Sequence, residues 1–236
     1  MGVDLVTGAL AAGTVLSIDQ LEERYGVSRS VVREVVRVLE QLGVATSRRR
    51  VGVTVQPPTR WEALSPVVIR WRLAGPGRLD QLREISELRT GTEPVAAALA
   101  ARRASPEQRA RLVEAAAGMF VTGTAGDLDT YLQHDIVFHT TLLEASGNAA
   151  FASLAPLVAA ALTGRTKHDL MPARPVPEAV RWHREIAEAV ATGDAVAAEH
   201  HAKLIVAEAQ DAVMPEETTT SERTVPLNPP QAADLQ

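Results

Sequence analysis

The chain has 236 residues, of which 46% are hydrophobic, 22% charged and 3% aromatic, with a formal net charge of −5. This composition is typical of a globular protein with one large or two ordinary domains, and the scarcity of aromatic residues favours closely packed helices. The absence of cysteine excludes disulfides, thiolate metal sites and cysteine nucleophiles. Because no apolar run approaches roughly 20 residues and no signal-peptide pattern opens the chain, we expect a cytoplasmic protein without a membrane partner.

The charges are unevenly distributed along the chain. Residues 1–60 hold eight arginines and six acidic residues, whereas the remainder holds 16 basic and 23 acidic residues. All six histidines follow residue 130. This segregation indicates two modules with different partners.

The N-terminal segment predicts two short helices followed by a hairpin. In residues 17–26 the apolar side chains share one helix face, and Gly26 ends that helix. Ser28 is a suitable N-cap for the second helix, which Gly43 ends. The residues expected on its apolar face are Val31, Val32, Val35, Val38, Leu39 and Leu42. The segment ATSRRRVGVTV then predicts two short strands, with residues 48–52 at the connecting tip.

Two helices joined by a tight glycine turn are typical of a helix-turn-helix, whose second helix inserts its N-terminal residues into the major groove. Arg29 and Arg33 project from one face of that helix, where they can reach guanine edges or phosphates. Ser28 and Ser30 can donate hydrogen bonds to phosphates. The competing interpretation is that the two arginines are ordinary solvated charges.

The predicted hairpin tip is strongly basic. Arg49 and Arg50 lie there, as expected for a wing that follows the DNA backbone or minor groove. A basic wing could instead bind an acidic protein, but the recognition-helix arrangement argues against that alternative.

Beyond a proline-containing linker the pattern is helical. Predicted helices span residues 66–73, 78–103, 106–120, 127–146, 148–165, 177–191 and 195–213. The fold class is therefore mainly α, an N-terminal winged helix-turn-helix joined to an all-helical bundle. The predicted divisions are a DNA-binding domain at 1–56, a linker with a connecting helix at 57–77, an effector-binding and dimerisation domain at 78–213, and a disordered tail at 214–236.

Several potential metal ligands lie in the helical half. Asp135 and His139, four residues apart, share a helix face; His183 lies on a later helix, and His200 and His201 on the last one. Helices of a bundle can bring such groups to one ion, and a carboxylate with imidazoles suits Zn, Ni, Mn or Fe. A solvent-facing Asp–His pair is the competing interpretation. Because a metal with these ligands can activate water, a metal-dependent hydrolase is the alternative function.

The N-terminal motifs carry a family resemblance. YGVSRSVVREVVRVLEQLGV followed by RRRVGVTV resembles the winged helix-turn-helix of the GntR family of bacterial regulators, over about residues 3–56. The resemblance implies DNA contacts by Arg29, Arg33, the hydroxyls of Ser28 and Ser30, and wing Gly52. A further basic contact of the family has no counterpart, because the segment before Leu21 reads Ser-Ile-Asp.

The helical half is similar to the FCD domain of the FadR-type branch of this family. The segments that carry the similarity are ELRTGTEPVAAALAARRA, HDIVFHTTLLEASGN and HREIAEAVATGD. It implies a bundle of six or seven helices whose cavity holds a small carboxylate effector, often beside a divalent metal. Asp135, His139 and His183 would be the metal ligands, Arg89 would receive the acid, and Asn148 would lie nearby.

One family ligand is missing. Where the family usually has its last histidine this chain has Ile205, and His201, one helical turn earlier, is the expected substitute. Without the resemblance, Arg89 and Glu93 would be interpreted as an exposed i,i+4 ion pair. The linker WEALSPVVIRWRL resembles that of galactonate-operon-type regulators and points to a sugar acid. The resulting expectation is a homodimeric repressor that binds double-stranded operator DNA under control of a carboxylate effector.

Overall fold

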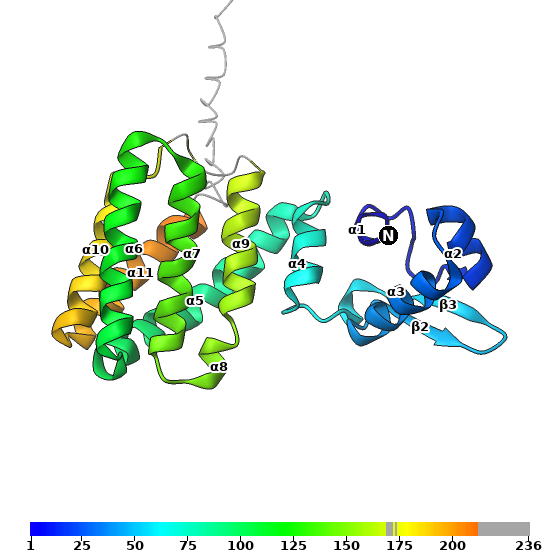
Figure 1. Ribbon diagram of the computed structural model, residues 1–236, viewed down its shortest axis with the longest axis horizontal. Helices are drawn as coiled ribbons and strands as arrows, with labels where there is room; N and C mark the ends of the chain where they lie inside the picture. Colours follow the sequence, from blue (N-terminus) through cyan, green and yellow to red (C-terminus); the bar gives the residue numbers. More distant parts are fainter. Residues whose placement is uncertain (169–171, 173, 212–236) are drawn as a thin grey trace, which may run out of the picture.

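The computed structural model describes residues 1–168, 172 and 174–211, and Figure 1 shows them as a small N-terminal part followed by a larger helical part. The predicted tail at 214–236 lies outside the described residues. The mainly helical architecture with one small N-terminal sheet confirms the expected fold class.

The N-terminal part combines three helices with a three-stranded sheet. Its elements are α1 (Gly2–Val6), β1 (Val15–Leu16), α2 (Ile18–Tyr25), α3 (Arg29–Gln41), β2 (Ala45–Arg48) and β3 (Gly52–Val55). The strands are antiparallel in the order β1-β3-β2, and the β2–β3 hairpin is the one predicted from the sequence. Strand β1 was not predicted, because two residues are too few to show an alternating pattern.

Local signals explain where α2 begins and ends. The Ser17 side chain accepts a hydrogen bond from the Gln20 backbone, and Gln20 in turn accepts one from the Ser17 backbone, which completes a capping box. Gly26 ends the helix in the left-handed conformation, with φ of 62°. The predicted turn between the two helices is therefore confirmed.

The buried face of α3 differs from the predicted one. The residues that it buries are Val32, Val36 and Leu39, at the spacing of one helix face. The residues that remain exposed are Val31, Val35 and Val38. Valines surround much of this helix, so their periodicity cannot indicate which side the rest of the domain covers.

Helix α4 (Pro66–Leu73) packs against both parts of the chain. A short 3₁₀ turn at Pro58–Arg60 precedes it. Val68 lies in the core of the N-terminal part, whereas Ile69 and Leu73 lie in a core of the helical part. The connecting helix predicted within residues 57–77 therefore contacts both parts of the chain.

The helical part consists of seven helices in the described residues. They are α5 (Arg78–Arg103), α6 (Pro106–Ala125), α7 (Leu128–Ala145), α8 (Ala149–Ala152), α9 (Ala155–Lys167), α10 (Pro177–Thr192) and α11 (Ala195–Asp211). Five of the six helices predicted for this part agree in position, but the helix expected at 148–165 is two helices, separated at Ser153 and Leu154. Pro156, which suits a first helical turn, follows that break.

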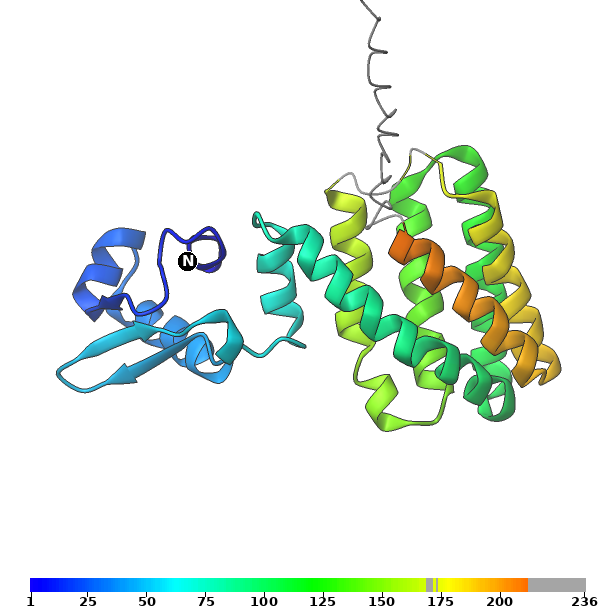
Figure 2. The ribbon, with the colours of Figure 1, turned by 180° about the vertical axis from the view of Figure 1, so that it is seen from behind.

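Helix α7 contacts α5, α6 and α9, while α11 packs on α5 and α10 (Figure 2). Much of the core between these helices is alanine, so their backbones approach closely. Side chains on the inner face of α7 therefore lie near residues from several other helices at once.

One stretch of the described residues, Ala149–Lys167, is long and apolar enough by composition to cross a membrane. It is made of α8 and α9, and Leu157, Val158 and Leu162 from it are buried in the same core as Ile69 and Leu73. This packing accounts for its apolar character as part of a protein core.

Candidate functional site

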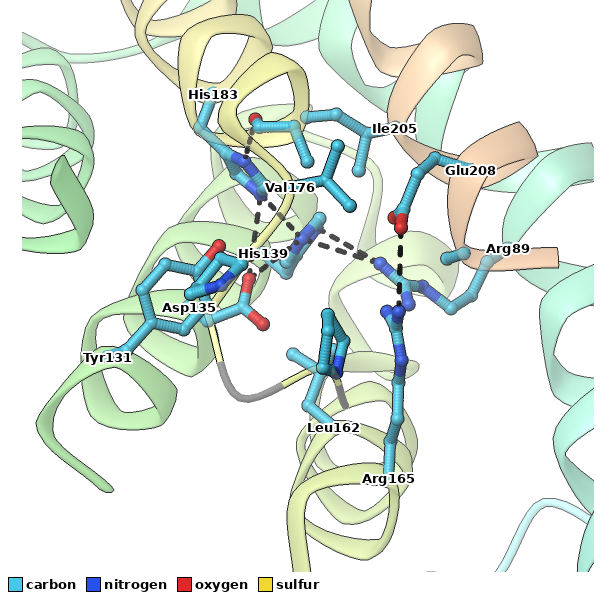
Figure 3. Close-up of a pocket in the computed structure, with 14 residues that line it drawn as sticks. Arg89, Tyr131, Asp135, His139, Leu162, Arg165, Val176, His183, Ile205 and Glu208 are labelled. Carbon is cyan, nitrogen blue, oxygen red and sulfur yellow. Dashed lines mark hydrogen bonds and ion pairs between the residues drawn. The ribbon is translucent and has the colours of Figure 1, made fainter. Parts of the chain in front are cut away.

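Three candidate metal ligands from two helices come together inside the helical part. Asp135 and His139 come from α7 and His183 from α10, and all three are buried (Figure 3). His139 Nε2 lies 3.2 Å from Asp135 Oδ1 and 3.2 Å from His183 Nε2. One donor atom from each residue lies within 4.8 Å of the other two, so the three predicted ligands converge.

The outer nitrogen of each imidazole already has a partner. His183 Nδ1 lies 2.7 Å from the Ala179 carbonyl oxygen, which can only accept, so this nitrogen carries the proton. His139 Nδ1 lies 2.9 Å from Glu93 Oε2 and donates to it in the same way. Both Nε2 atoms therefore face Asp135. Such outer partners are what metal-binding histidines usually have.

The Asp135 carboxylate has a polar atom without a hydrogen bond. Its Oδ1 is buried close to both histidines, yet no described group donates a well-aligned hydrogen bond to it. A buried carboxylate oxygen without a hydrogen bond, beside two imidazole Nε2 atoms, is a donor set that suits a divalent cation.

Charges within this cluster shift its pKa values. Burial alone would raise the pKa of Glu93, but Arg89 and His139 outweigh it and hold that pKa at about 2. The two histidines likewise hold the pKa of Asp135 below its ordinary value, although burial opposes this. Burial lowers the pKa of His139, but the Glu93 carboxylate more than offsets this and raises it to about 9. A cation that binds His139 Nε2 must therefore displace a proton.

Arg89 forms a buried ion pair with Glu93. The distances are 2.6 Å from Arg89 Nε to Glu93 Oε1 and 3.2 Å from Arg89 Nη2 to Glu93 Oε2. The i,i+4 pair considered from the sequence therefore exists, but it is buried rather than exposed. Arg89 also lines the central cavity, as the family resemblance implied.

The cavity beside the cluster is small, and both charged and apolar side chains line it. Its walls come from α5, α7, α9, α10 and α11, and its open space of about 30 Å³ holds little more than one or two water molecules. Besides the predicted residues it is lined by Tyr131, Arg165 and Glu208 (Figure 3). Sequence reasoning missed Arg165 and Glu208, because an isolated charge on a helix carries no signal of what it faces.

Two expected site residues lie elsewhere. His201 is not part of the cluster; its Nδ1 faces Glu185 Oε2 at 3.1 Å, and Ile205 and Glu208 are the α11 residues that line the cavity. One helical turn from Ile205 displaces a side chain along α11 and by about 40° around it, enough to change its neighbour. Asn148 is not a cavity residue either; its side chain caps α8 by accepting a hydrogen bond from the Ala150 backbone.

A second candidate site is a basic groove between α3 and the β2–β3 wing. The arginines that line it are Arg29, Arg33, Arg37, Arg48, Arg49 and Arg50. Glu40 of α3 accepts a hydrogen bond from the Ser47 backbone, which ties the wing to the helix. The structure thus brings the predicted recognition-helix and wing arginines to one exposed surface.

Arg29 is held by acidic side chains of α2. It forms ion pairs with Asp19 and Glu22. Asp19 lies in the segment before Leu21, where the family resemblance implied a basic residue that contacts DNA. In this chain the acidic side chain of Asp19 pairs with Arg29 instead. To contact DNA, Arg29 must exchange these carboxylates for phosphate or base acceptors. Ser28 and Ser30 are exposed, with their hydroxyls 3.0 Å apart.

The wing requires glycine at residue 52. Gly52 has φ of 114°, and a Cβ there would lie 2.7 Å from the Leu16 carbonyl oxygen of β1. Its conformation lets the hairpin pass close to β1 and leaves Arg49 and Arg50 exposed at the tip.

Comparisons with known proteins agree with this two-part organisation. The protein-family model described as "FCD domain" matches residues 84–208. A second family model, described as "Bacterial regulatory proteins, gntR family", matches residues 3–55. The chain is 25% identical over 209 residues to the galactonate operon transcriptional repressor of Escherichia coli, covering 88% of this chain and 90% of the repressor.

Two further similarities extend over most of the chain. An uncharacterised HTH-type transcriptional regulator of Mycobacterium tuberculosis is 30% identical over 196 residues, or 82% of this chain and 78% of that protein. A solved structure of Lar, described as controlling the agr system of Listeria monocytogenes, shares the fold with a TM-score of 0.62 at 17% identity, covering 92% of this chain and 94% of that one.

The family matches decide between a regulator and the metal-dependent hydrolase considered as the alternative. The FCD match alone covers more than half of the chain, and the gntR match contains the recognition helix and the wing. The chain therefore belongs to the gntR family of bacterial regulatory proteins, as a member with a C-terminal FCD domain, and it is a DNA-binding transcription regulator rather than an enzyme.

Proposed function

We propose that this regulator is a cytoplasmic repressor whose operator binding is controlled by a small carboxylate effector bound beside a divalent metal. The observation that carries the proposal is the convergence of two histidine Nε2 atoms on an orphaned oxygen of Asp135. A sugar acid such as galactonate is the effector class, supported by the similarity to a repressor named for the galactonate operon.

Asp135, His139 and His183 would hold the metal, which is Zn, Ni or Mn on ligand chemistry. When bound, the metal supplies a Lewis-acid contact for the effector's carboxylate. With Ile205 in place of a fourth donor, three protein ligands leave a coordination position open. Arg89 lines the same cavity and can donate to the other carboxylate oxygen.

The small size of the cavity suggests how effector binding reaches the DNA-binding part. Pockets for small molecules usually measure about 300–1,000 Å³, far more than the open space here. A sugar acid can enter only if the helices around the cavity move apart. Among them α9 packs on α4, and α4 contacts α1 of the N-terminal part. An effector that favours the expanded bundle therefore favours one arrangement of the DNA-binding domains.

The test is operator binding titrated with galactonate, using metal-loaded and chelator-treated protein on a duplex selected in vitro from random sequences. Galactonate should release the metal-loaded protein from DNA, and removing the metal should abolish the release without preventing binding. If chelated and metal-loaded proteins respond alike, the metal has no role in effector sensing.

We also propose that the protein binds DNA as a homodimer. One recognition helix as short as α3 offers few base contacts, and two-fold pairing doubles them. The operator should then be pseudo-palindromic, with half-sites separated by about one helical turn or a multiple of it.

Substitution of the recognition-helix arginines should weaken specific binding. Because Arg29 and Arg33 lie at the start of α3 within the basic groove, Arg29→Ala or Arg33→Ala should each cost about 1–3 kcal/mol of operator affinity. Arg49→Ala and Arg50→Ala should instead weaken all duplexes about equally and flatten the salt dependence. Mobility-shift titrations at several salt concentrations measure both effects, and footprinting on the same operator should show two related half-sites. An unchanged affinity for both α3 variants would refute the recognition-helix assignment.

A further inference from the structure

Across the cavity from the candidate metal ligands lies a second polar group, formed by Arg165 of α9 and Glu208 of α11 (Figure 3). The side chains are only 12% and 21% exposed. Arg165 Nη2 lies 3.7 Å from Glu208 Oε1, a distance too long for a direct hydrogen bond. Arg165 Nε is buried and has no hydrogen-bond partner among the described residues.

This arrangement leaves hydrogen-bonding capacity unused at the cavity wall. A buried donor without a partner is unfavourable, so a ligand acceptor that pairs with it should bind roughly tenfold more tightly. A guanidinium supplies only donors and a carboxylate only acceptors. A ligand hydroxyl donates and accepts at once, so neighbouring hydroxyls can satisfy Arg165 and Glu208 together.

The charges around the cavity favour a singly charged ligand. With both histidines neutral, as they are when they hold a metal ion, Arg89 and Arg165 face three carboxylates, those of Glu93, Asp135 and Glu208, and the protein groups alone carry one net negative charge. A divalent ion bound by the neutral histidines changes the net charge around the cavity to one positive charge. One carboxylate from the ligand then brings the buried site to neutrality, whereas a dicarboxylate would leave an uncompensated negative charge, which is costly in a buried site.

We propose that Arg165 and Glu208 form a hydroxyl-binding subsite that selects a polyhydroxylated monocarboxylate, an aldonate, over its dicarboxylate and its hydroxyl-free counterparts. This inference rests on the proposed function, since the ligand's carboxylate lies at the metal and Arg89. The hydroxylated end of the ligand then lies between α9 and α11.

Calorimetric titration of the metal-loaded, full-length protein with matched six-carbon acids tests the subsite. The probes are galactonate and gluconate, the dicarboxylates galactarate and glucarate, and hexanoate, which has no hydroxyls. The better aldonate should bind at least ~10-fold more tightly than its own dicarboxylate and more than ~100-fold more tightly than hexanoate, because a site built for hydroxyls rejects analogues that lack them.

Two substitutions separate charge from hydrogen bonding. Glu208→Gln removes one negative charge while keeping the side-chain shape, so the preference should shift toward the dicarboxylate by about tenfold. Arg165→Gln should weaken aldonate binding at least ~10-fold without changing metal content. Glu185→Gln is the matched control, since Glu185 lies outside the cavity and should leave the preference unchanged.

The outcomes distinguish this inference from the proposed function. If aldonates, dicarboxylates and hexanoate bind alike in a metal-dependent manner, the hydroxyl-binding subsite is overturned and the carboxylate–metal proposal stands. The subsite is likewise overturned if Glu208→Gln leaves the ratio of aldonate to dicarboxylate affinity unchanged. If no acid binds to metal-loaded protein, both proposals fail.

Discussion

Replacing His139 or His183 with alanine should remove the bound metal and the effector response together, while operator binding without effector persists. Each histidine supplies one of three converging donors, and each has its other ring nitrogen held by Glu93 or by the Ala179 carbonyl. Losing a hydrogen-bond partner of a metal ligand typically lowers metal affinity by about 10–100-fold. Losing the ligand itself should therefore lower metal affinity by at least about 100-fold. Elemental analysis beside an operator titration measures both quantities.

Two histidines of α11 serve as matched controls. His200 is exposed, and His201 faces Glu185 instead of the cluster. His200→Ala and His201→Ala should therefore leave metal content and effector response unchanged. A His139→Ala protein that still responds fully to effector while carrying no metal would separate the two functions and leave the cluster as a packing feature.

Glu93→Gln should destabilise the fold and weaken metal binding at once. Glu93 is almost fully buried, and its carboxylate faces the Arg89 guanidinium and His139 Nδ1. Removing one partner of a buried ion pair leaves the other charge uncompensated, which typically costs about 3–5 kcal/mol. This is a large part of the roughly 5–15 kcal/mol by which domains are usually stable. Denaturant unfolding of metal-free protein measures the loss.

The same variant should lower metal affinity by about 10–100-fold, because Glu93 orients His139 through its Nδ1 proton. The double substitution Arg89→Met with Glu93→Met removes both charges with similar volume, so it should recover most of the lost stability. We therefore expect the double variant to recover stability but not metal affinity. If Glu93→Gln unfolds at the same denaturant concentration as the native chain, the buried pair has no structural role.

Much of the fold could be predicted from local chemistry. Serine caps, left-handed glycines and helical spacing placed α2, α3, α5 and α10 within a few residues of their observed bounds. These signals act within one or two turns of the chain, so they do not depend on packing. The i,i+4 pair Asp135 and His139 follows from helix geometry alone, whereas the choice of His183 among the later histidines came from the family resemblance.

Only the tertiary structure decided which face of each helix is buried and which side chains contact one another there. Valine surrounds much of α3, and alanine lines most faces of the bundle helices, so the sequence has little contrast between inside and outside. The rotation of each helix about its axis therefore depends on packing against its neighbours. That rotation turns Ile205 and Glu208 toward the cavity and His201 toward Glu185.

By itself the sequence determined the family and the order of most elements, and the family resemblance predicted the metal ligands, of which Asp135, His139 and His183 lie together in the structure. The burial of the Arg89–Glu93 pair and the position of Arg165 and Glu208 across the cavity were decided by tertiary structure. The physical reason is that a helix pattern relates residues three or four apart, whereas this site joins side chains from helices that lie far apart in the sequence, from α5 to α11. Their convergence depends on how those helices pack, and no local pattern records it.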